Sequence, residues 1–283
     1  MKIGIVGMGV MGGSLLLALK NANFFNGEIY CHVRNQKSRN WCNENGATKT
    51  IDDVSDFPED LDFLFLAAPV NSLEGIAKEI GKTESKAIIS DLASTKEELI
   101  PTLCKHLENK KFLSCHPMCG SEKSGFIGSD VNLYKNKTVV LTPHDEKSAS
   151  YQRELGEFWE KIGSRTLTLS PAIHDASVAW VSHMPHVLMY SLIHAISEAE
   201  KKTPDIFNVA GTGLRDLSRL AASNPDLWTQ IILENKHSVI QAISGIQDEL
   251  TKVKKILEEH PDEKELHQYL LAARDTVSQK GLN

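Results

Sequence analysis

A histidine that could act as a general base lies in the segment Ser114–Glu122, which reads SCHPMCGSE. His116 follows an apolar run and precedes Pro117, which restricts the backbone and keeps the imidazole out of a helix. A neutral imidazole near a nicotinamide can accept the proton of an alcohol as hydride leaves the same carbon. The residues alone leave two roles open for His116, a catalytic base and a buried structural histidine.

A second polar segment, Ser90–Lys96, also follows an apolar run and reads SDLASTK. If that run is a strand of a doubly wound sheet, its carboxyl end borders the ligand crevice. Ser94 or Thr95 would also suit the N-cap of a following helix. Ser94 is therefore open to both a catalytic role and a capping role.

Histidines recur in the second half of the chain, where the pattern is helical. His183 and His186 are three residues apart, so a helix would place them on one face. The carboxylate of an HExxH-type site is missing, and the CHPMC run lacks a second ligand pair with suitable spacing. We expect no metal site. Pro185 near the start of a helical pattern predicts a kink.

The elements that would position these side chains begin with a glycine turn. The run GMGVMG at 7–12 follows the apolar KIGIV and opens a helical pattern. Gly7 permits the tight turn, Gly9 leaves room for a pyrophosphate, and Gly12 lets helix and strand pack closely. Val10 and Met11 lie at the helix start, where amide hydrogens and the positive end of the helix hold the pyrophosphate. We expect a nicotinamide dinucleotide as cofactor.

The next strand pattern bears on which dinucleotide binds. NAD sites usually carry Asp or Glu about 20 residues after the glycines, but Val33 stands there. Arg34 follows, with Asn35 and Lys37 beyond it, and a guanidinium suits a 2′-phosphate. We predict NADP, with NAD as the possible alternative. The alternative is that Arg34 and Lys37 are ordinary solvated charges on the protein surface.

Apolar runs alternate with amphipathic stretches through the first half of the chain. The expected strands are Lys2–Val6, Glu28–Val33, Leu61–Ala67, Ala87–Ser90, Phe112–Cys115, Thr138–Leu141 and Thr166–Leu169. Helices are expected between them at Met11–Ala22, Ser72–Ile80, Lys96–Leu107 and Glu146–Ile162. This alternation predicts a mainly parallel sheet covered on both faces.

Beyond Pro171 the pattern is helical throughout. The expected helices are Ala172–Lys201, Pro204–Val209, Leu214–Ala222, Pro225–Glu258 and Glu263–Val277. We therefore predict an α/β Rossmann-type domain over residues 1–170 and an all-α domain over 171–283. A helix as long as Pro225–Glu258 is expected to pack in a bundle or across a subunit interface.

Composition narrows the class of protein. The chain has 283 residues, a formal net charge of −6 and no apolar run of the length that spans a membrane. An acidic balance argues against a nucleic-acid or anionic-membrane partner. Five cysteines without a CxxC pair predict reduced thiols and a cytoplasmic protein.

The ordered set of motifs resembles the prephenate and arogenate dehydrogenases, the oxidative decarboxylases of tyrosine synthesis. The motifs are the glycine turn, DLAST, HPMCGSE, the HD pair at 174–175, SHMPH, and GLRDLSR with Trp228 nine residues after Arg219. The resemblance covers essentially the whole chain. It implies a Rossmann domain followed by a helical domain that forms a homodimer.

The resemblance also implies residue roles. His116 would accept the proton of the substrate's ring hydroxyl, and Ser94 would hydrogen-bond near that hydroxyl and the nicotinamide. Arg219 would bind a substrate carboxylate. The other substrate-pocket positions that it implies are His186, Ser182, His174, Ser121 and Glu122. Cys119 departs from the small residue usual at its place.

Other enzymes share the glycine turn and a helical second domain. A β-hydroxyacid dehydrogenase or imine reductase is the nearest alternative, although neither needs HPMCGSE or SHMPH. A dinucleotide-sensing regulatory protein is a third, but it has no reason to supply His116 and Arg219. Prephenate and arogenate differ in a keto or amino group, and the sequence leaves that choice open.

Overall fold

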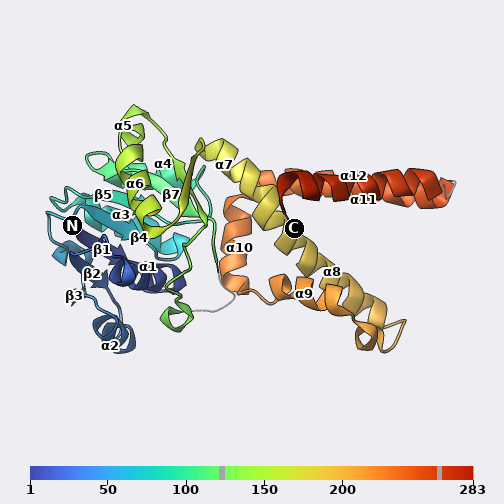
Figure 1. Cartoon of the computed structure of the whole chain (residues 1–283), viewed down its shortest axis with the longest axis horizontal. Helices are drawn as coiled ribbons and strands as arrows, with labels where there is room; N and C mark the ends of the chain where they lie inside the picture. The colour runs from blue at the N-terminus through green and yellow to red at the C-terminus, as the bar shows by residue number, and fades with distance from the viewer. Residues whose placement is uncertain (121–124, 260–262, 283) are drawn as a thin grey trace. The chain divides into compact units, whose positions relative to one another are not determined.

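The computed structural model describes residues 1–120, 125–259 and 263–282. The chain divides into two compact units, Met1–Lys236 and His237–Asn283. The first unit holds a parallel sheet and its covering helices (Figure 1).

The main sheet has six parallel strands in the order β3-β2-β1-β4-β5-β6. Its strands are β1 (Lys2–Val6), β2 (Glu28–His32), β3 (Lys49–Ile51), β4 (Phe63–Leu66), β5 (Ile88–Asp91) and β6 (Lys111–Phe112). The strand order reverses direction between β1 and β4, and ligands of open α/β sheets bind at such a reversal. The predicted Rossmann-type α/β class is confirmed.

Side chains of the central strands alternate between two buried clusters. Phe63 and Phe65 of β4 join one cluster, whereas Leu64 and Leu66 join the other. Helices α1 (Val10–Asn21) and α6 (Gln152–Ile162) contribute to the first cluster, and α3 (Val70–Gly81) and α4 (Leu99–Leu107) contribute to the second. Both faces of the sheet are therefore covered, which explains its continuous apolar strands. Two shorter helices complete this part: α2 (Gln36–Glu44) and α5 (Glu146–Ala149).

The expected strand Phe112–Cys115 is wrong in one respect, because the chain changes sheets within it. β6 ends at Phe112, and β7 (Ser114–Pro117) belongs to a second sheet with β8 (Thr138–Thr142) and β9 (Arg165–Thr168). β7 runs antiparallel to β8, which pairs His116 with Val140. A short apolar run gives no signal of such a change, because Phe112 of β6 and all of β7 are buried alike.

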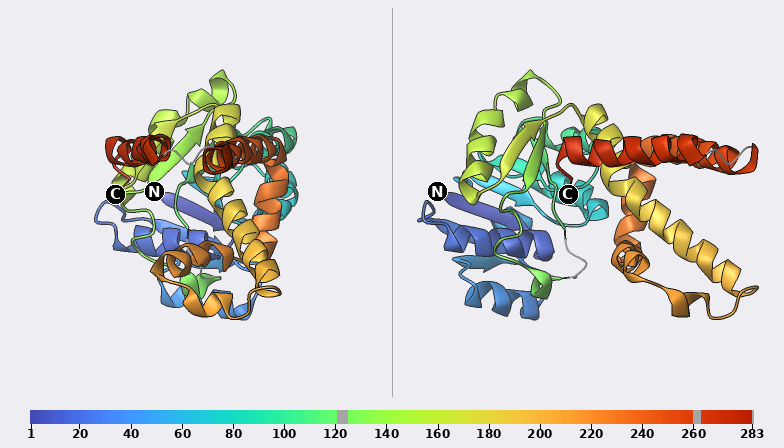
Figure 2. Two further views of the ribbon diagram at one scale, coloured as in Figure 1. Left: turned by 90° about the vertical axis from the view of Figure 1, so that its right-hand side faces the viewer. Right: turned by 45° about the vertical axis from the view of Figure 1, so that its right-hand side comes forward.

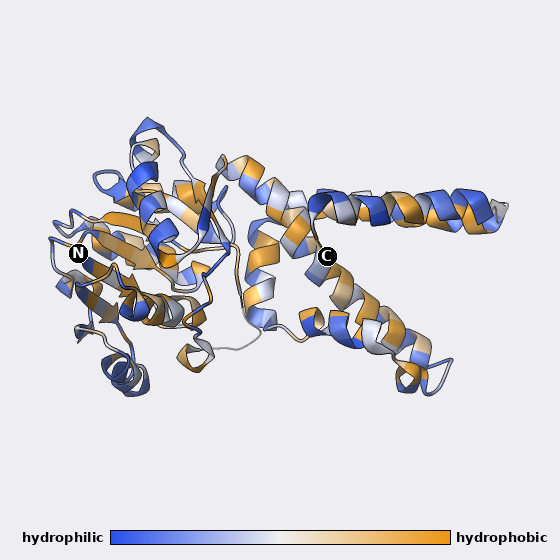
Figure 3. Ribbon diagram, in the orientation of Figure 1, coloured by the Kyte–Doolittle hydropathy of each residue, from blue (hydrophilic) through white to orange (hydrophobic). Residues whose placement is uncertain are grey.

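Every described element after Thr168 is helical. They are α7 (Pro171–Val178), α8 (Met184–Glu200), α9 (Thr212–Ala221), α10 (Pro225–Glu234), α11 (Lys236–Glu259) and α12 (Glu263–Lys280), with a short 3₁₀ turn at Ile206–Val209. A π-helical segment, Ala179–His183, joins α7 to α8. It lies where Pro185 predicts a kink, since proline cannot complete the regular hydrogen-bond ladder. α8 shows hydrophobic stretches along its length (Figure 3).

The single long helix expected over Pro225–Glu258 is interrupted at Asn235. Its buried amide donates to the carbonyl oxygen of Asp175 at 2.8 Å and lies 3.2 Å from His183 Nδ1. These contacts come from residues 52 and 60 positions away, so the local pattern gives no sign of the break.

The second unit contains most of α11 and all of α12, which are drawn from further sides in Figure 2. Tyr269 on α12 donates its hydroxyl to Glu249 on α11 at 3.2 Å. Among the described residues, no helix combines the length and apolar character needed to cross a membrane.

Candidate active site

The glycine turn connects β1 to α1 and has the backbone that a dinucleotide site needs. Gly7 adopts φ +94°, and a methyl group there would lie 2.6 Å from the amide nitrogen of Ala68. A methyl group on Gly12 would lie 2.0 Å from the carbonyl oxygen of Gly7, so this glycine serves helix packing. A methyl group on Gly9 would meet no atom within 4 Å, and no side chain caps α1 there. The helix start is thus open to a pyrophosphate, and the residues fit a nicotinamide dinucleotide.

A cavity of about 580 Å³ extends from this turn. Its wall comes from the carboxyl ends of the strands and from α10. The lining residues predicted from sequence are Gly7, Gly9, Val10, Met11, Arg34, Asn35, Ser94 and His116. Glycine turn, expected base and expected serine therefore share one cavity.

The end of the cavity beyond β2 carries the residues predicted to choose the cofactor. Val33, Arg34 and Asn35 line it, while Lys37 is exposed and does not. Arg34 is exposed and forms no hydrogen bond or ion pair with the described side chains, whereas Arg39 is paired with Asp52. Asn35 caps α2 by accepting from the amide of Ser38 at 2.9 Å.

Ser94 lies between β5 and α4, on the cavity wall. It does not cap α4, because that helix begins at Leu99 and its N-cap is Glu98. The expected helix start at Lys96 is early by one turn. The amides of Lys96 and Glu97 donate to the carboxylate of Asp175 at 2.9–3.1 Å instead of receiving a serine cap.

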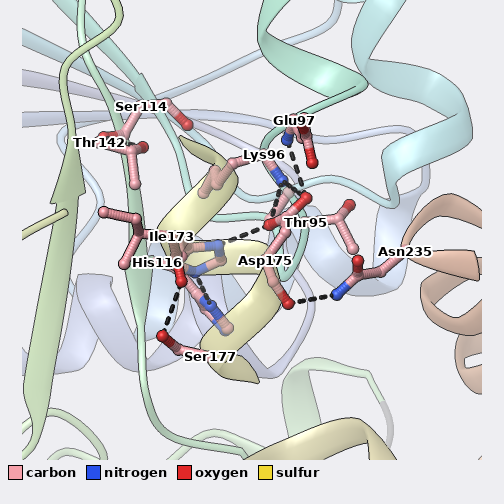
Figure 4. A network of polar contacts seen from close by, with 12 residues as sticks. Thr95, Lys96, Glu97, Ser114, His116, Thr142, Ile173, Asp175, Ser177 and Asn235 are labelled. Carbon is pink, nitrogen blue, oxygen red and sulfur yellow. Dashed lines mark hydrogen bonds and ion pairs between the residues drawn. The ribbon is translucent and has the colours of Figure 1, made fainter. Parts of the chain in front are cut away.

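His116, on β7, is held by two residues of α7. Its Nδ1 lies 2.9 Å from Nε2 of His174, and Nδ1 of His174 lies 2.6 Å from Oδ1 of Asp175. Figure 4 shows Asp175 between the imidazoles and the amides of Lys96 and Glu97. His174 and Asp175 are buried, and neither lines the cavity. The structure thus places His174, expected at the substrate pocket, behind His116.

The hydrogen bonds determine which ring nitrogen of each histidine carries the proton. Asp175 is an acceptor only, so His174 donates to it from Nδ1 and must accept at Nε2. His116 then donates from Nδ1 to His174, which leaves the lone pair of His116 on Nε2. That nitrogen is free to take a proton from a ligand in the cavity.

Electrostatics keep this chain of groups in the required forms. Burial would raise the pKa of Asp175, but the hydrogen bonds from His174, Glu97 and Lys96 outweigh it, and its pKa lies below the usual value. Burial, followed by the neighbouring His174, Lys96 and His183, lowers the pKa of His116 well below the usual value. His116 is therefore neutral at pH 7 and able to accept a proton.

The remaining predicted substrate residues lie outside the cavity lining. His186 stacks on Trp228, with ring centroids 3.4 Å apart, and its Nδ1 lies 3.1 Å from the carbonyl oxygen of Leu220. Trp228 does line the cavity, so His186 supports the wall from behind. Ser182 lies in the π-helical segment.

Arg219 is exposed on α9, four residues before Ser223, which lines the cavity. Its guanidinium forms no hydrogen bond or ion pair within the described part of the chain. Ser121 and Glu122 lie outside the described residues.

Four residues of this site escaped the sequence analysis as functional candidates: Asp91, Lys96, Asp175 and Asn235. The available signal was a lysine in the polar segment that follows an apolar strand, five residues after Asp91. In the structure Lys96 is fully buried. Nothing local could have linked it to Asp175, 79 residues away. Among the described residues, no three His, Cys, Asp or Glu side chains are grouped to hold a metal ion.

Two family models match consecutive parts of the chain. Residues 16–168 match prephenate dehydrogenase, nucleotide-binding domain, and residues 170–272 match prephenate dehydrogenase, dimerization domain. A curated relative, the cyclohexadienyl dehydrogenase of Zymomonas mobilis, is 32% identical over 256 residues, which are 89% of this chain and 87% of the relative.

Solved structures similar to this chain include dehydrogenases of the same kind. A prephenate dehydrogenase from Aquifex aeolicus, in complex with hydroxyphenyl propionate and NAD⁺, has a TM-score of 0.90 and 32% identity, covering 100% of this chain and 98% of that one. The arogenate dehydrogenase of Synechocystis has a TM-score of 0.82 and 26% identity, covering 99% of this chain and 100% of that one.

Proposed function

The chain belongs to the prephenate dehydrogenase family, and we propose that it oxidises and decarboxylates prephenate or arogenate through the base His116. The reaction is an NAD(P)-linked step of tyrosine biosynthesis. Both family models describe prephenate dehydrogenases, so the alternative of a β-hydroxyacid dehydrogenase or imine reductase loses its support. The observation that carries the role of His116 is its place on the wall of the cavity that also contains the glycine turn.

The mechanism follows from the proton positions at His116. Its Nε2 takes the proton of the substrate's ring hydroxyl, while Nδ1 keeps its hydrogen bond to His174. A nicotinamide dinucleotide held at the glycine turn by Gly7, Gly9 and Val10 would accept the hydride from the carbon that bears this oxygen. The C–CO₂ bond then breaks and carbon dioxide leaves, while the bond's electron pair moves through the ring onto the carbonyl oxygen. That oxygen takes the proton back from Nε2 of His116, and the ring becomes aromatic. Aromatisation drives the reaction, so the protein mainly positions and polarises the substrate.

Ser94 lines the same cavity as His116, and we assign it the hydrogen bond near the hydroxyl and the nicotinamide. Arg219 is assigned to a substrate carboxylate, because a guanidinium binds a carboxylate through two parallel hydrogen bonds. Its position near the Ser223 part of the wall supports this assignment. His186 acts by supporting Trp228.

Among the nicotinamide dinucleotides, NADP is the cofactor that we propose. The cavity wall carries Arg34 where a 2′-phosphate would need a cation, and the neighbouring Val33 offers no acceptor to a ribose hydroxyl. Arg39 is engaged by Asp52, which leaves Arg34 as the proposed phosphate ligand.

We also propose a homodimer built through the helical part, with the domain boundary near residue 170. Apolar side chains on several helices are strongly exposed in the single chain: Val181, Leu192, Leu217, Leu250 and Leu270. α9 and α12 bury no residue at all among those described. Exposed apolar helix faces of this extent are typical of subunit interfaces.

A product assay tests the proposed reaction. Purified protein is incubated with prephenate or arogenate and with NADP or NAD, and carbon dioxide and reduced cofactor are measured together. We expect the two products in equal amounts with at least one substrate. Cofactor reduction without carbon dioxide, or no turnover with either substrate, would contradict the proposal.

A further inference from the structure

Lys96 is a charged residue with no exposed surface, located between β5 and α4. Its Nζ lies 2.6 Å from Oδ1 of Asp91, which is equally buried, and donates to the carbonyl oxygen of Cys115 at 2.8 Å. A buried ion pair is weak evidence for stability, because each ion loses its hydration. Such a pair in the core of a domain therefore calls for another explanation.

The pair connects the end of one sheet to the start of the other. Asp91 closes β5 of the main sheet, and its second oxygen accepts from the hydroxyl of Ser114 on β7. Lys96 holds the carbonyl of Cys115, the residue directly before His116. The ion pair thus fixes the main chain of the strand that carries the imidazole.

The main chain of the same lysine holds the other side of the imidazole. Its amide donates to the Asp175 carboxylate, which accepts from His174, which in turn contacts His116. Lys96 therefore contacts the strand that carries His116 and also Asp175, the carboxylate that holds His174. Figure 4 shows its amide directed at Asp175.

We propose that Lys96 is a positioning residue for the base, acting on the strand that carries His116 through the Cys115 carbonyl and through Asp91. This inference rests on the proposed function, since it concerns the same base.

The charged and titratable groups around His116 come from three elements. They are His174 and Asp175 on α7, His183 in the π-helical segment, and Lys96 with Asp91 at the end of β5. Burial is the largest cause of the low pKa of His116, and the nearby His174, Lys96 and His183 lower it further. If the positive charge of Lys96 is removed, the protonated form of His116 is repelled less, so we expect the pKa of His116 to rise.

The test compares Lys96→Met with Lys78→Met, which changes an exposed lysine on α3. NMR titration of ¹⁵N-labelled histidines, in protein without ligands, follows the His116 signal, assigned by its absence in His116→Asn. We expect the pKa of His116 to rise by roughly one unit in Lys96→Met and to stay unchanged in Lys78→Met. In turnover, the acid limb of kcat/KM should move to higher pH by the same amount.

If Lys96 positions His116, its replacement should affect the catalytic rate and cofactor binding to different extents. kcat of Lys96→Met should fall at least about tenfold, because a small misplacement of a base is costly, while the cofactor Kd stays within about twofold. The double variant Lys96→Met/Asp91→Asn avoids leaving a buried carboxylate unpaired, and the pKa of His116 should rise less in it than in Lys96→Met, because the negative charge of Asp91 is removed as well.

The outcomes separate this inference from the proposed function. An unchanged pKa of His116, with a kcat loss equal at every pH, overturns the role of Lys96. Failure of both Lys96 variants to fold also overturns it, in favour of a purely structural role. If His116→Asn itself keeps near-normal turnover, the proposed function fails, whatever the NMR titration shows.

Discussion

At His116 the two ring nitrogens have different surroundings, and this difference decides what the residue can do. Nδ1 is engaged by His174, and Asp175 fixes the tautomer of that partner. An isolated buried histidine would be free to place its proton on either nitrogen. Here the carboxylate of Asp175, acting through His174, leaves the lone pair of His116 on Nε2, the nitrogen that we propose as the base.

Replacing His116 by asparagine tests this assignment. The amide cannot accept the hydroxyl proton, so we expect kcat to fall by about 10²- to 10⁴-fold. The cofactor Kd, measured by isothermal titration calorimetry, should change little, because the glycine turn lies on another element. A large loss of cofactor binding would mean that His116 serves the dinucleotide instead.

Arg34 is the residue on which the cofactor prediction depends. In Arg34→Ala a charged hydrogen-bond donor is lost, so we expect the Kd for NADP to rise about 10- to 100-fold and the Kd for NAD to change little. Lys49→Ala, an exposed lysine on β3, is the control. Equal affinities of the wild type for NAD and NADP would reject the preference.

At the scale of elements, the π-helical segment carries a histidine that burial keeps neutral. His183 is buried, its Nε2 has no hydrogen-bond partner within the described part of the chain, and its pKa is lowered to about 4, chiefly by burial. The unfolded chain binds a proton at this histidine near pH 6.5, whereas the folded chain does not until about pH 4.

Stability should therefore fall with acidification. Between pH 6.5 and 4 the unfolded state binds more protons, so the free energy of unfolding decreases by about 3 kcal/mol from His183 alone. His116 and His174 add to the same trend, since burial lowers both pKa values.

Urea denaturation at several pH values measures this slope. In His183→Gln the slope should be shallower, because one of the three histidines is gone. The exposed His194→Gln on α8 should leave it unchanged. An identical slope in the wild type and His183→Gln would contradict the low pKa.

For the whole molecule, the distribution of apolar surface is the informative feature. The Rossmann part buries its apolar residues in two clusters that cover both faces of the sheet. The helical part instead leaves long apolar side chains exposed, including Leu250 on α11 and Leu270 on α12. A second copy of the chain is the partner we propose for this surface.

Analytical ultracentrifugation tests the dimer. The wild type is expected at twice the monomer mass, and Leu250→Glu should shift the equilibrium to monomer, because a buried unpaired charge is costly at an interface. Leu167→Glu, an exposed leucine on β9, applies the same change to the Rossmann part and should leave the dimer intact. A monomeric wild type would remove the basis of the proposal.

The sequence by itself determined what depends on local signals. The glycine turn and the alternation of strands and helices rest on residues close together in the chain, and the family rests on an ordered set of short motifs. Gly7 needs a backbone that glycine favours, and the apolar strands need covering on both faces. Each of these constraints acts over a few residues, so a pattern can carry it.

Only the tertiary structure decided which distant groups meet. Asp175 reaches the amides of Lys96 and Glu97 across 79 and 78 residues, which delays the start of α4. Asn235 meets Asp175 and His183, which divides an apparently continuous helix, and Lys96 meets the carbonyl before His116. The physical reason is that buried polar groups must find partners, and the partners are set by packing rather than by neighbours in the chain.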